Sequence, residues 1–83
     1  MNSIVTKPTV PDVLPIAKAY LAKPGNAVGG SLHIVLDDGN VQDSHVDHCI
    51  ERARERGDED GVLLATLLRQ MSRTQRLKIS NLV

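Results

Sequence analysis

One loop of this chain combines glycine and serine at a spacing that suggests ligand chemistry. Residues 24–31 read PGNAVGGS, and three of these eight residues are glycine. Glycines allow a ligand to approach the backbone closely, and a helix that begins after them offers unpaired N–H groups to a phosphate or carboxylate. The N–H groups of Gly29, Gly30 and Ser31, with the neighbouring Lys23, are therefore predicted to bind an anion. The competing interpretation is that the glycines only turn the chain between two helices.

Three arginines supply the positive charge that such an anion would need. Arg69, Arg73 and Arg76 follow one another in steps of four and three residues, which places them on one helical face if the helix continues through Ser72. A planar guanidinium binds a phosphate through two parallel hydrogen bonds, so the row is predicted to clamp phosphate oxygens. Because one small subunit offers little concavity, we expect the anion between subunits. The competing interpretation is a solvated helix end whose cations match the helix dipole.

A second polar set combines histidines, carboxylates and the single cysteine, residue types that bind zinc and other divalent ions. The set consists of His33, Asp37, Asp38, His45, His48 and Cys49. His45 and His48 are three residues apart and share a helical face, which the two aspartates approach across a turn. The spacings HExxH and CxxC do not occur, and Cys49 falls on an apolar stripe. We therefore predict no metal, no cofactor and no catalytic residue.

Length and composition limit the classes of protein to which the chain can belong. Its 83 residues allow a single domain, 1–83, in which residues 1–10 are predicted to form an extended arm. The single cysteine predicts a reducing, cytoplasmic setting. The start of the chain does not resemble a signal peptide, and no apolar run approaches the roughly 18 residues of a membrane span. Ten cations balance ten acids, which excludes a general nucleic-acid binder.

The net charge of zero hides an uneven distribution along the chain. Residues 43–60 contain seven acids and three arginines, a net charge of −4, whereas residues 61–83 contain four cations and no acid, a net charge of +4. Such an asymmetry steers an anion or a partner. The alternative explanation is helix chemistry, because acids favour helix N-termini and cations favour helix C-termini.

Helices must position these groups. Apolar periodicity predicts an all-α bundle of four to five short helices, and their expected ranges are 12–22, 31–38, 43–56, 59–72 and 73–80. In an alternative α+β fold, residues 32–36 form a strand of a short hairpin over 32–42 that turns at DDGN. The return strand of that hairpin, Val41-Gln42, is too short to stand alone.

Particular residues are predicted to begin and end these helices. Asp12 is the expected N-cap of the first helix, with Pro15 in its first turn, and Ser31 is the expected N-cap of the second, which Gly39 ends. Gly57 is predicted to end the third helix in a left-handed conformation. Two pairs of residues have the spacing of a capping box and predict helix starts. The first is Ser44 with Asp47, where Asp43 is the alternative cap, and the second is Ser72 with Gln75.

The helix predicted over 59–72 has an apolar face that is wide for so small a fold. The face consists of Leu63, Leu64, Leu67, Leu68 and Met71, with Val62 beside it. Tyr20 is the only aromatic residue, so the chain has little bulk with which to cover this face. We therefore predict a homo-oligomer, most simply a dimer.

Three blocks of the sequence resemble a group of small uncharacterised phage and prophage open reading frames. The blocks are GGSLHIVLDDGN (29–40), DSHVDHC (43–49) and MSRTQR (71–76), and the resemblance covers residues 29–78. It implies the cytoplasm of an infected bacterium as the setting, and it assigns no catalytic or binding residue.

Three functions are compatible with these patterns. The leading one is a non-enzymatic phage accessory protein that acts by binding, either sequestering a small nucleotide-like anion or inhibiting a host defence protein. A DNA-binding transcriptional regulator is the alternative, and only residues 69–78 could supply its recognition helix. A small metal-dependent hydrolase that uses the histidine and aspartate set is the second alternative.

Overall fold

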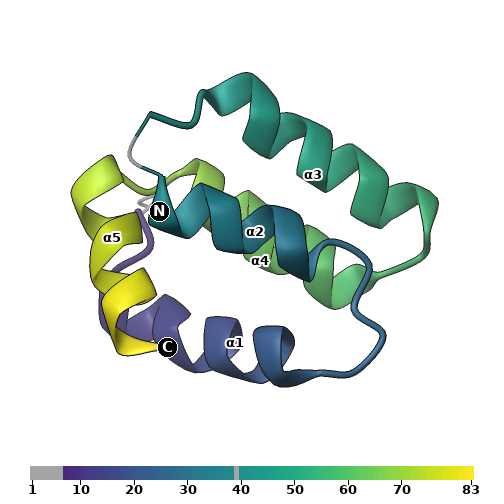
Figure 1. Cartoon of the computed structure of the whole chain (residues 1–83), viewed down its shortest axis with the longest axis horizontal. Coiled ribbons are helices and arrows are strands. Elements are labelled where there is room, and N and C mark those ends of the chain that lie inside the picture. Colours follow the sequence, from purple (N-terminus) through teal and green to yellow (C-terminus); the bar gives the residue numbers. More distant parts are fainter. Residues whose placement is uncertain (1–6, 39) are drawn as a thin grey trace, which may run out of the picture.

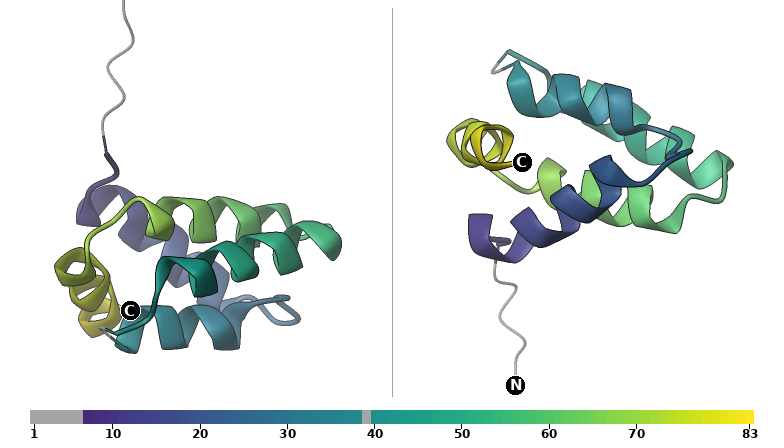
Figure 2. Two further views of the ribbon diagram at one scale, coloured as in Figure 1. Left: turned by 90° about the horizontal axis from the view of Figure 1, so that it is seen from above. Right: turned by 60° about the horizontal axis from the view of Figure 1, so that its bottom comes forward.

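The computed structural model describes residues 7–38 and 40–83, and within these residues the chain forms five helices and no strand. The helices are α1 (Val10–Ala22), α2 (Gly29–Asp37), α3 (Asp43–Glu55), α4 (Glu59–Arg69) and α5 (Arg73–Leu82). The first four run in alternating directions, and α5 crosses one end of them (Figures 1 and 2). The all-α prediction is confirmed. Within the same residues, no helix has the length and apolar character of a membrane span.

The first helix begins two residues earlier than predicted. Thr9 is its N-cap, and the Thr9 hydroxyl accepts a hydrogen bond from the backbone N–H of Asp12. Pro11 occupies the first turn, where a missing N–H costs nothing, and Pro15 lies further inside the helix. The predicted cap at Asp12 is therefore wrong, and Val10 belongs to α1 rather than to an arm. Arm residues 1–6 lie outside the described residues.

The second helix begins at Gly29, so the predicted cap at Ser31 is wrong. The side-chain oxygen of Asn26 accepts a hydrogen bond from the Gly29 N–H at 3.0 Å and caps the helix from upstream. A Cβ at Gly29 would overlap this amide, which explains the glycine. Residues 32–36 are helical, and the alternative strand is wrong because Leu32, Val35 and Leu36 are buried at helical spacing. Gly39 lies outside the described residues.

The third helix begins at Asp43 without the predicted side-chain cap. Gln42 is the N-cap residue, and its side chain makes no capping hydrogen bond. The predicted box of Ser44 with Asp47 does not form. The Asp47 carboxylate instead accepts a hydrogen bond from the Arg69 guanidinium at 2.9 Å. Asp47 thus contacts Arg69 of a distant segment and takes no part in a local cap.

Helices α3 and α4 pack against each other and are joined by a tight turn. Gly57 adopts a φ of +70° and ends α3 as predicted. Its N–H donates to the carbonyl of Arg54 at 3.1 Å, and the N–H of Asp58 donates to the carbonyl of Ala53 at 2.9 Å, which together form a Schellman motif. Asp58 then caps α4 by accepting a hydrogen bond from the Gly61 N–H.

The chain breaks between α4 and α5, as the second capping-box spacing predicted, but α4 ends at Arg69, three residues before the predicted end. The Ser72 hydroxyl accepts from the Gln75 N–H at 3.2 Å, and the Gln75 side chain accepts from the Ser72 N–H at 2.9 Å. Arg69 ends α4 and Arg73 begins α5. The arginine row therefore does not lie on one continuous helix.

The core is aliphatic apart from Tyr20. Cys49 is buried in this core, as its position on the apolar stripe predicted. The wide apolar face of α4 is divided in the structure. Leu64 and Leu68 are completely buried, whereas the side chain of Leu63 remains 49% exposed. Part of the face predicted to mediate assembly therefore belongs to the core of the single chain.

Candidate functional site

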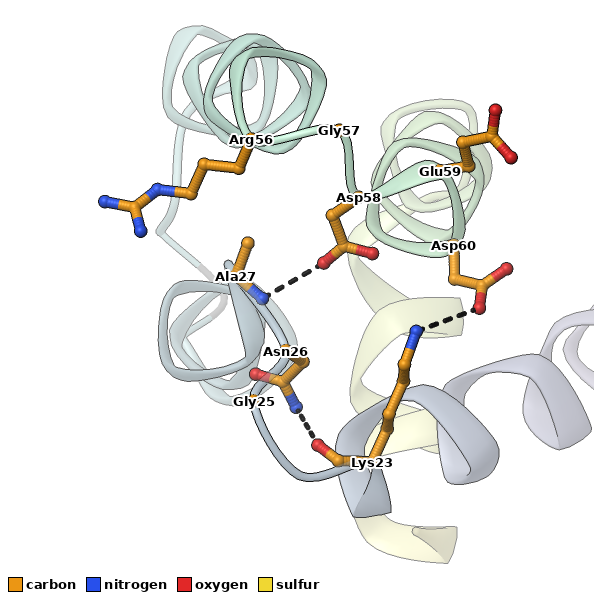
Figure 3. A pocket seen from close by; sticks show the side chains of 9 residues that line it. All are labelled: Lys23, Gly25, Asn26, Ala27, Arg56, Gly57, Asp58, Glu59 and Asp60. Carbon is orange, nitrogen blue, oxygen red and sulfur yellow. Dashed lines mark hydrogen bonds and ion pairs between the residues drawn. The ribbon is translucent and has the colours of Figure 1, made fainter.

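One carboxylate joins three segments at the end of the molecule where the glycine-rich loop lies. Asp58 Oδ2 accepts hydrogen bonds from the Tyr20 hydroxyl at 2.7 Å and from the Ala27 N–H at 3.0 Å, the second of which is drawn in Figure 3. Asp58 Oδ1 accepts from the Gly61 N–H at 3.1 Å. The donors come from α1, from the loop and from α4, so this side chain fixes their relative positions.

The absence of a side chain at Gly61 makes this network possible. A Cβ at this position would lie 2.8 Å from the Tyr20 hydroxyl oxygen and 2.9 Å from Asp58 Oδ2. Those separations are shorter than side-chain carbons tolerate, so any larger residue would displace the tyrosine or the carboxylate. Glycine at position 61 therefore serves the close approach of α1 to α4 rather than a ligand.

The network changes the pKa of both side chains. Burial and the hydrogen bond to the Asp58 carboxylate raise the pKa of Tyr20 to about 12. Burial alone would raise the pKa of Asp58, but hydrogen bonds from Tyr20, Ala27 and Gly61 and the charge of Lys23 outweigh it and hold that pKa below its usual value. Tyr20 is thus neutral and Asp58 ionised near pH 7. Neither group is suited to proton transfer at that pH.

The loop predicted to bind a phosphate already holds an anion, which is the carboxylate of Asp58. The Ala27 N–H donates to this carboxylate, and the Val28 N–H donates to the Tyr20 hydroxyl at 3.1 Å. The Gly29 N–H is bonded to a side chain of the same loop. The anion beside this loop belongs to the chain itself, and its donor in the loop is Ala27 rather than the predicted Gly29, Gly30 or Ser31.

The predicted anion-binding residues at this end are only partly accessible. Gly29 is buried, Ser31 is half-buried, and Gly30 is exposed in the first turn of α2. Lys23 lies beside the loop, where its Nζ is 3.4 Å from a carboxylate oxygen of Asp60. The lysine therefore faces an acid of the same chain.

An open hollow of about 700 Å³ lies between this loop and the turn from α3 to α4. It is lined by Lys23, Gly25, Asn26, Ala27, Arg56, Gly57, Asp58, Glu59 and Asp60. Three of these residues are acids and two are cations, and the Arg56 side chain extends away from the Asp58 carboxylate (Figure 3). A free phosphate here would meet more negative than positive charge.

Two of the predicted arginines are engaged with partners inside the chain. Arg69 lies 2.9 Å from an oxygen of Asp47 and 3.0 Å from an oxygen of Asp43. Arg76 is buried, and its Nε donates to the carbonyl of Leu68 at 2.8 Å, which satisfies a carbonyl in the last turn of α4. Both guanidinium groups thus hold α4 to its neighbours.

The structure does not bring the arginines to the glycine-rich loop. Lys23 contacts Asp60 at the start of α4, whereas Arg69 ends that helix, and nine residues of helix span about 14 Å. Arg73 is exposed and lies with Arg76 beside a small hollow of about 170 Å³. Within one chain, the two halves of the predicted anion site are therefore separate.

The histidine and aspartate set does not assemble into a metal centre. Asp37 accepts a hydrogen bond from the Ser80 hydroxyl, and Asp38 accepts one from the Asn40 N–H at 2.8 Å. Across residues 7–38 and 40–83, no group of three or more His, Cys, Asp or Glu side chains could hold a metal ion. Burial raises the pKa of the Cys49 thiol, as expected for a core residue.

The contact between Tyr20 and Asp58 was not predicted from the sequence. A usable signal was the buried aromatic hydroxyl, which needs a hydrogen-bond partner. The two residues are 38 positions apart, and local patterns do not pair such distant residues.

Both polar centres, one at each end of α4, thus serve contacts within the chain. Comparisons with protein-family models, with curated proteins and with solved structures each find no match. The function is therefore inferred from the side chains that are exposed among the described residues.

Proposed function

We propose that this protein acts by binding another protein and that α5 presents the contact surface. The support is the distribution of exposed apolar side chains. Among the described residues, the large hydrophobic side chains that are exposed are Ile34, Leu63, Leu77, Leu82 and Val83. Three of these five lie in the last seven residues of the chain, and Leu77 and Leu82 are 38% and 52% exposed.

Cations accompany the exposed leucines of α5. Arg73 and Lys78 are both exposed, and residues 61–83 contain no acid. Arg73 and Leu77 border the same small hollow. Such a surface fits a protein partner that offers an apolar patch with carboxylates at its edge.

Helix α5 is held firmly enough to act as a preformed surface. Its start is fixed by the capping box of Ser72 and Gln75, and Ile79 is completely buried. The buried guanidinium of Arg76 anchors the helix to the end of α4. A helix ordered before binding loses less conformational entropy when the complex forms.

The resemblance to phage and prophage reading frames suggests which partner to expect, namely a host protein such as a defence component that this chain inhibits. Sequestration of a nucleotide-like anion has less support. The N–H groups of Ala27, Val28 and Gly29, and the guanidinium groups of Arg69 and Arg76, have partners within the chain.

DNA binding is a second candidate, favoured by the three-residue connection between α4 and α5. A connection of this length is typical of a helix-turn-helix, and Arg73, Thr74 and Lys78 are exposed on the second helix. Asp38 and Asp43 line the same hollow as Arg73, however, and the net charge of the chain is zero. Both features oppose contact with a phosphate backbone.

Identification of a host partner, followed by calorimetric titration with the purified partner, tests the proposal. Leu77→Asp and Arg73→Glu should each weaken binding at least about tenfold. Arg52→Glu, which changes an exposed cation on α3, is the matched control and should bind like the wild type. Salt-dependent binding to duplex DNA without a protein partner would instead support the second candidate. Equal loss in all three variants would contradict a contact through α5.

A further inference from the structure

A second apolar surface lies along the seam between α1 and α4, away from the exposed residues of α5. Its most prominent side chain is Leu63, which is 49% exposed. Ile16 and Leu67 beside it are half-buried and pack against the core from outside. Leu63 and its two half-buried neighbours form the apolar part of this seam.

Two shallow hollows follow each other along this seam, and Ile16 borders both. One hollow, of about 360 Å³, is lined by Ile16, Ala19, Tyr20, Lys23, Asp60 and Leu63. The other, of about 290 Å³, is lined by Lys7, Pro8, Asp12, Val13, Ile16, Leu67 and Gln70. Leu63 and Leu67 lie about one helical turn apart, so the hollows lie side by side with Ile16 at their junction.

We infer that this seam binds a second copy of the chain through a two-fold axis that passes near Ile16. An antiparallel arrangement inserts Leu63 of each copy into the hollow beside Leu67 of the other. Such an interface is self-complementary, because the protruding residue and the hollow both occur on one surface. The arrangement buries the leucine that the single chain leaves exposed.

The charges at the two ends of the seam fit the same arrangement. Lys23 and Asp60 border one hollow, and Lys7 and Asp12 border the other. Antiparallel pairing brings Lys23 toward Asp12 of the second copy, and Asp60 toward Lys7 of the second copy. Each end carries one cation and one acid, so this pairing places no net like charge at either end.

A dimer through the seam must bury the surface around the two hollows as well as the hollows themselves. A stable interface buries roughly 600–800 Å² on each partner. The chain exposes 5132 Å² in total, so about one seventh of its surface would suffice. Neither hollow is lined by a residue of α5, so the residues that support this inference differ from those of the proposed function. The inference is therefore independent of that proposal.

Light scattering on the purified chain at micromolar concentration tests the dimer. We expect a dimer for the wild type and a monomer for Leu63→Glu, with unchanged helical circular dichroism. Ile34→Glu is the matched control, because Ile34 is 53% exposed on α2 and lies outside the seam. That variant should remain dimeric. A monomeric wild type, or a dimeric Leu63→Glu variant, would overturn the inference.

A cysteine at the junction tests the symmetry. Under mild oxidation, Ile16→Cys should form a disulfide between copies, because the axis brings this position close to itself. Ile34→Cys should stay uncrosslinked, and the native Cys49 is buried. A dimer that crosslinks at position 34 but not at 16 would exclude the seam. Because these measurements need no partner, their failure is distinguishable from failure of the proposed function.

Discussion

The two ends of α4 contact neighbouring segments of the chain through different kinds of polar interaction. At the N-terminal end, the ionised Asp58 accepts hydrogen bonds from uncharged donors, which are the Tyr20 hydroxyl and two backbone N–H groups. At the C-terminal end, the charged Arg69 is paired with the carboxylates of Asp43 and Asp47. The first set joins three segments around a buried tyrosine, and the second lies at the surface between α3 and α4.

Solvent exposure decides which end contributes more to stability. The side chains of Arg69, Asp43 and Asp47 are 38%, 61% and 55% exposed, and exposed ion pairs contribute about 0–1 kcal/mol. A buried donor that loses its acceptor costs about 1–3 kcal/mol. The N-terminal end of α4, which has fewer charges, is therefore expected to contribute more to the free energy of unfolding. Water competes with the surface pairs, whereas the tyrosine hydroxyl has little access to it.

The largest effect is expected from Asp58→Ala. The substitution removes the N-cap of α4 and the acceptor for both Tyr20 and Ala27. We expect a loss of about 3–4 kcal/mol in the free energy of unfolding, measured by urea denaturation. Asp60→Ala is the control, because its carboxylate is exposed and contacts only Lys23 among the described residues. Equal losses for the two variants would contradict the comparison.

Tyr20→Phe removes the two hydrogen bonds that the tyrosine hydroxyl makes in this network. The ring keeps its packing, but Asp58 loses a donor and the Val28 N–H loses its acceptor. We expect a loss of about 1–3 kcal/mol. A double-mutant cycle with Asp58→Asn should show coupling between the two sites. Additive losses in that cycle would mean that the two side chains contribute independently.

Local signals predicted the helices well and the polar contacts poorly. The left-handed glycine at position 57 and the box of Ser72 with Gln75 depend on neighbouring residues, and both formed as predicted. The expected box of Ser44 with Asp47 did not form, because α3 begins at Asp43 and Ser44 lies inside the helix. The Asp47 carboxylate contacts Arg69 instead, a distant partner that short-range patterns cannot include.

The candidate anion site shows the same limit. The glycine-rich segment predicted an anion at the N–H groups of Gly29, Gly30 and Ser31, but no local pattern indicated that Asp58 accepts a hydrogen bond from Ala27. Charge counting likewise found an excess of cations in residues 61–83 without showing that Arg76 is buried beneath α4. Which charges remain exposed is decided by packing between distant segments.

Acid should weaken the N-terminal end selectively. The pKa of Asp58 is lower in the folded chain than in the unfolded chain, so the unfolded state binds more protons in acid. The stability that ionised Asp58 contributes is complete above its unfolded pKa, about 4, and is lost as the pH falls through the folded pKa. The gap in melting temperature between wild type and Asp58→Asn should narrow from about pH 7 to about pH 3. A difference in melting temperature that stays constant over this pH range would contradict the stabilising role of ionised Asp58.

The smallest effect is expected from Arg69→Gln at the other end of α4. Glutamine keeps a hydrogen-bonding group and much of the aliphatic stem, so the substitution removes mainly the charge that faces Asp43 and Asp47. Because all three side chains are in contact with solvent, we expect a loss below about 1 kcal/mol. The loss should vanish near 1 M salt, where screening acts over about 3 Å, whereas the loss in Tyr20→Phe should persist. Urea denaturation of both variants at low and high salt measures this difference. If Arg69→Gln were the more damaging change at either salt concentration, the surface pairs rather than the buried network would hold α4 in place.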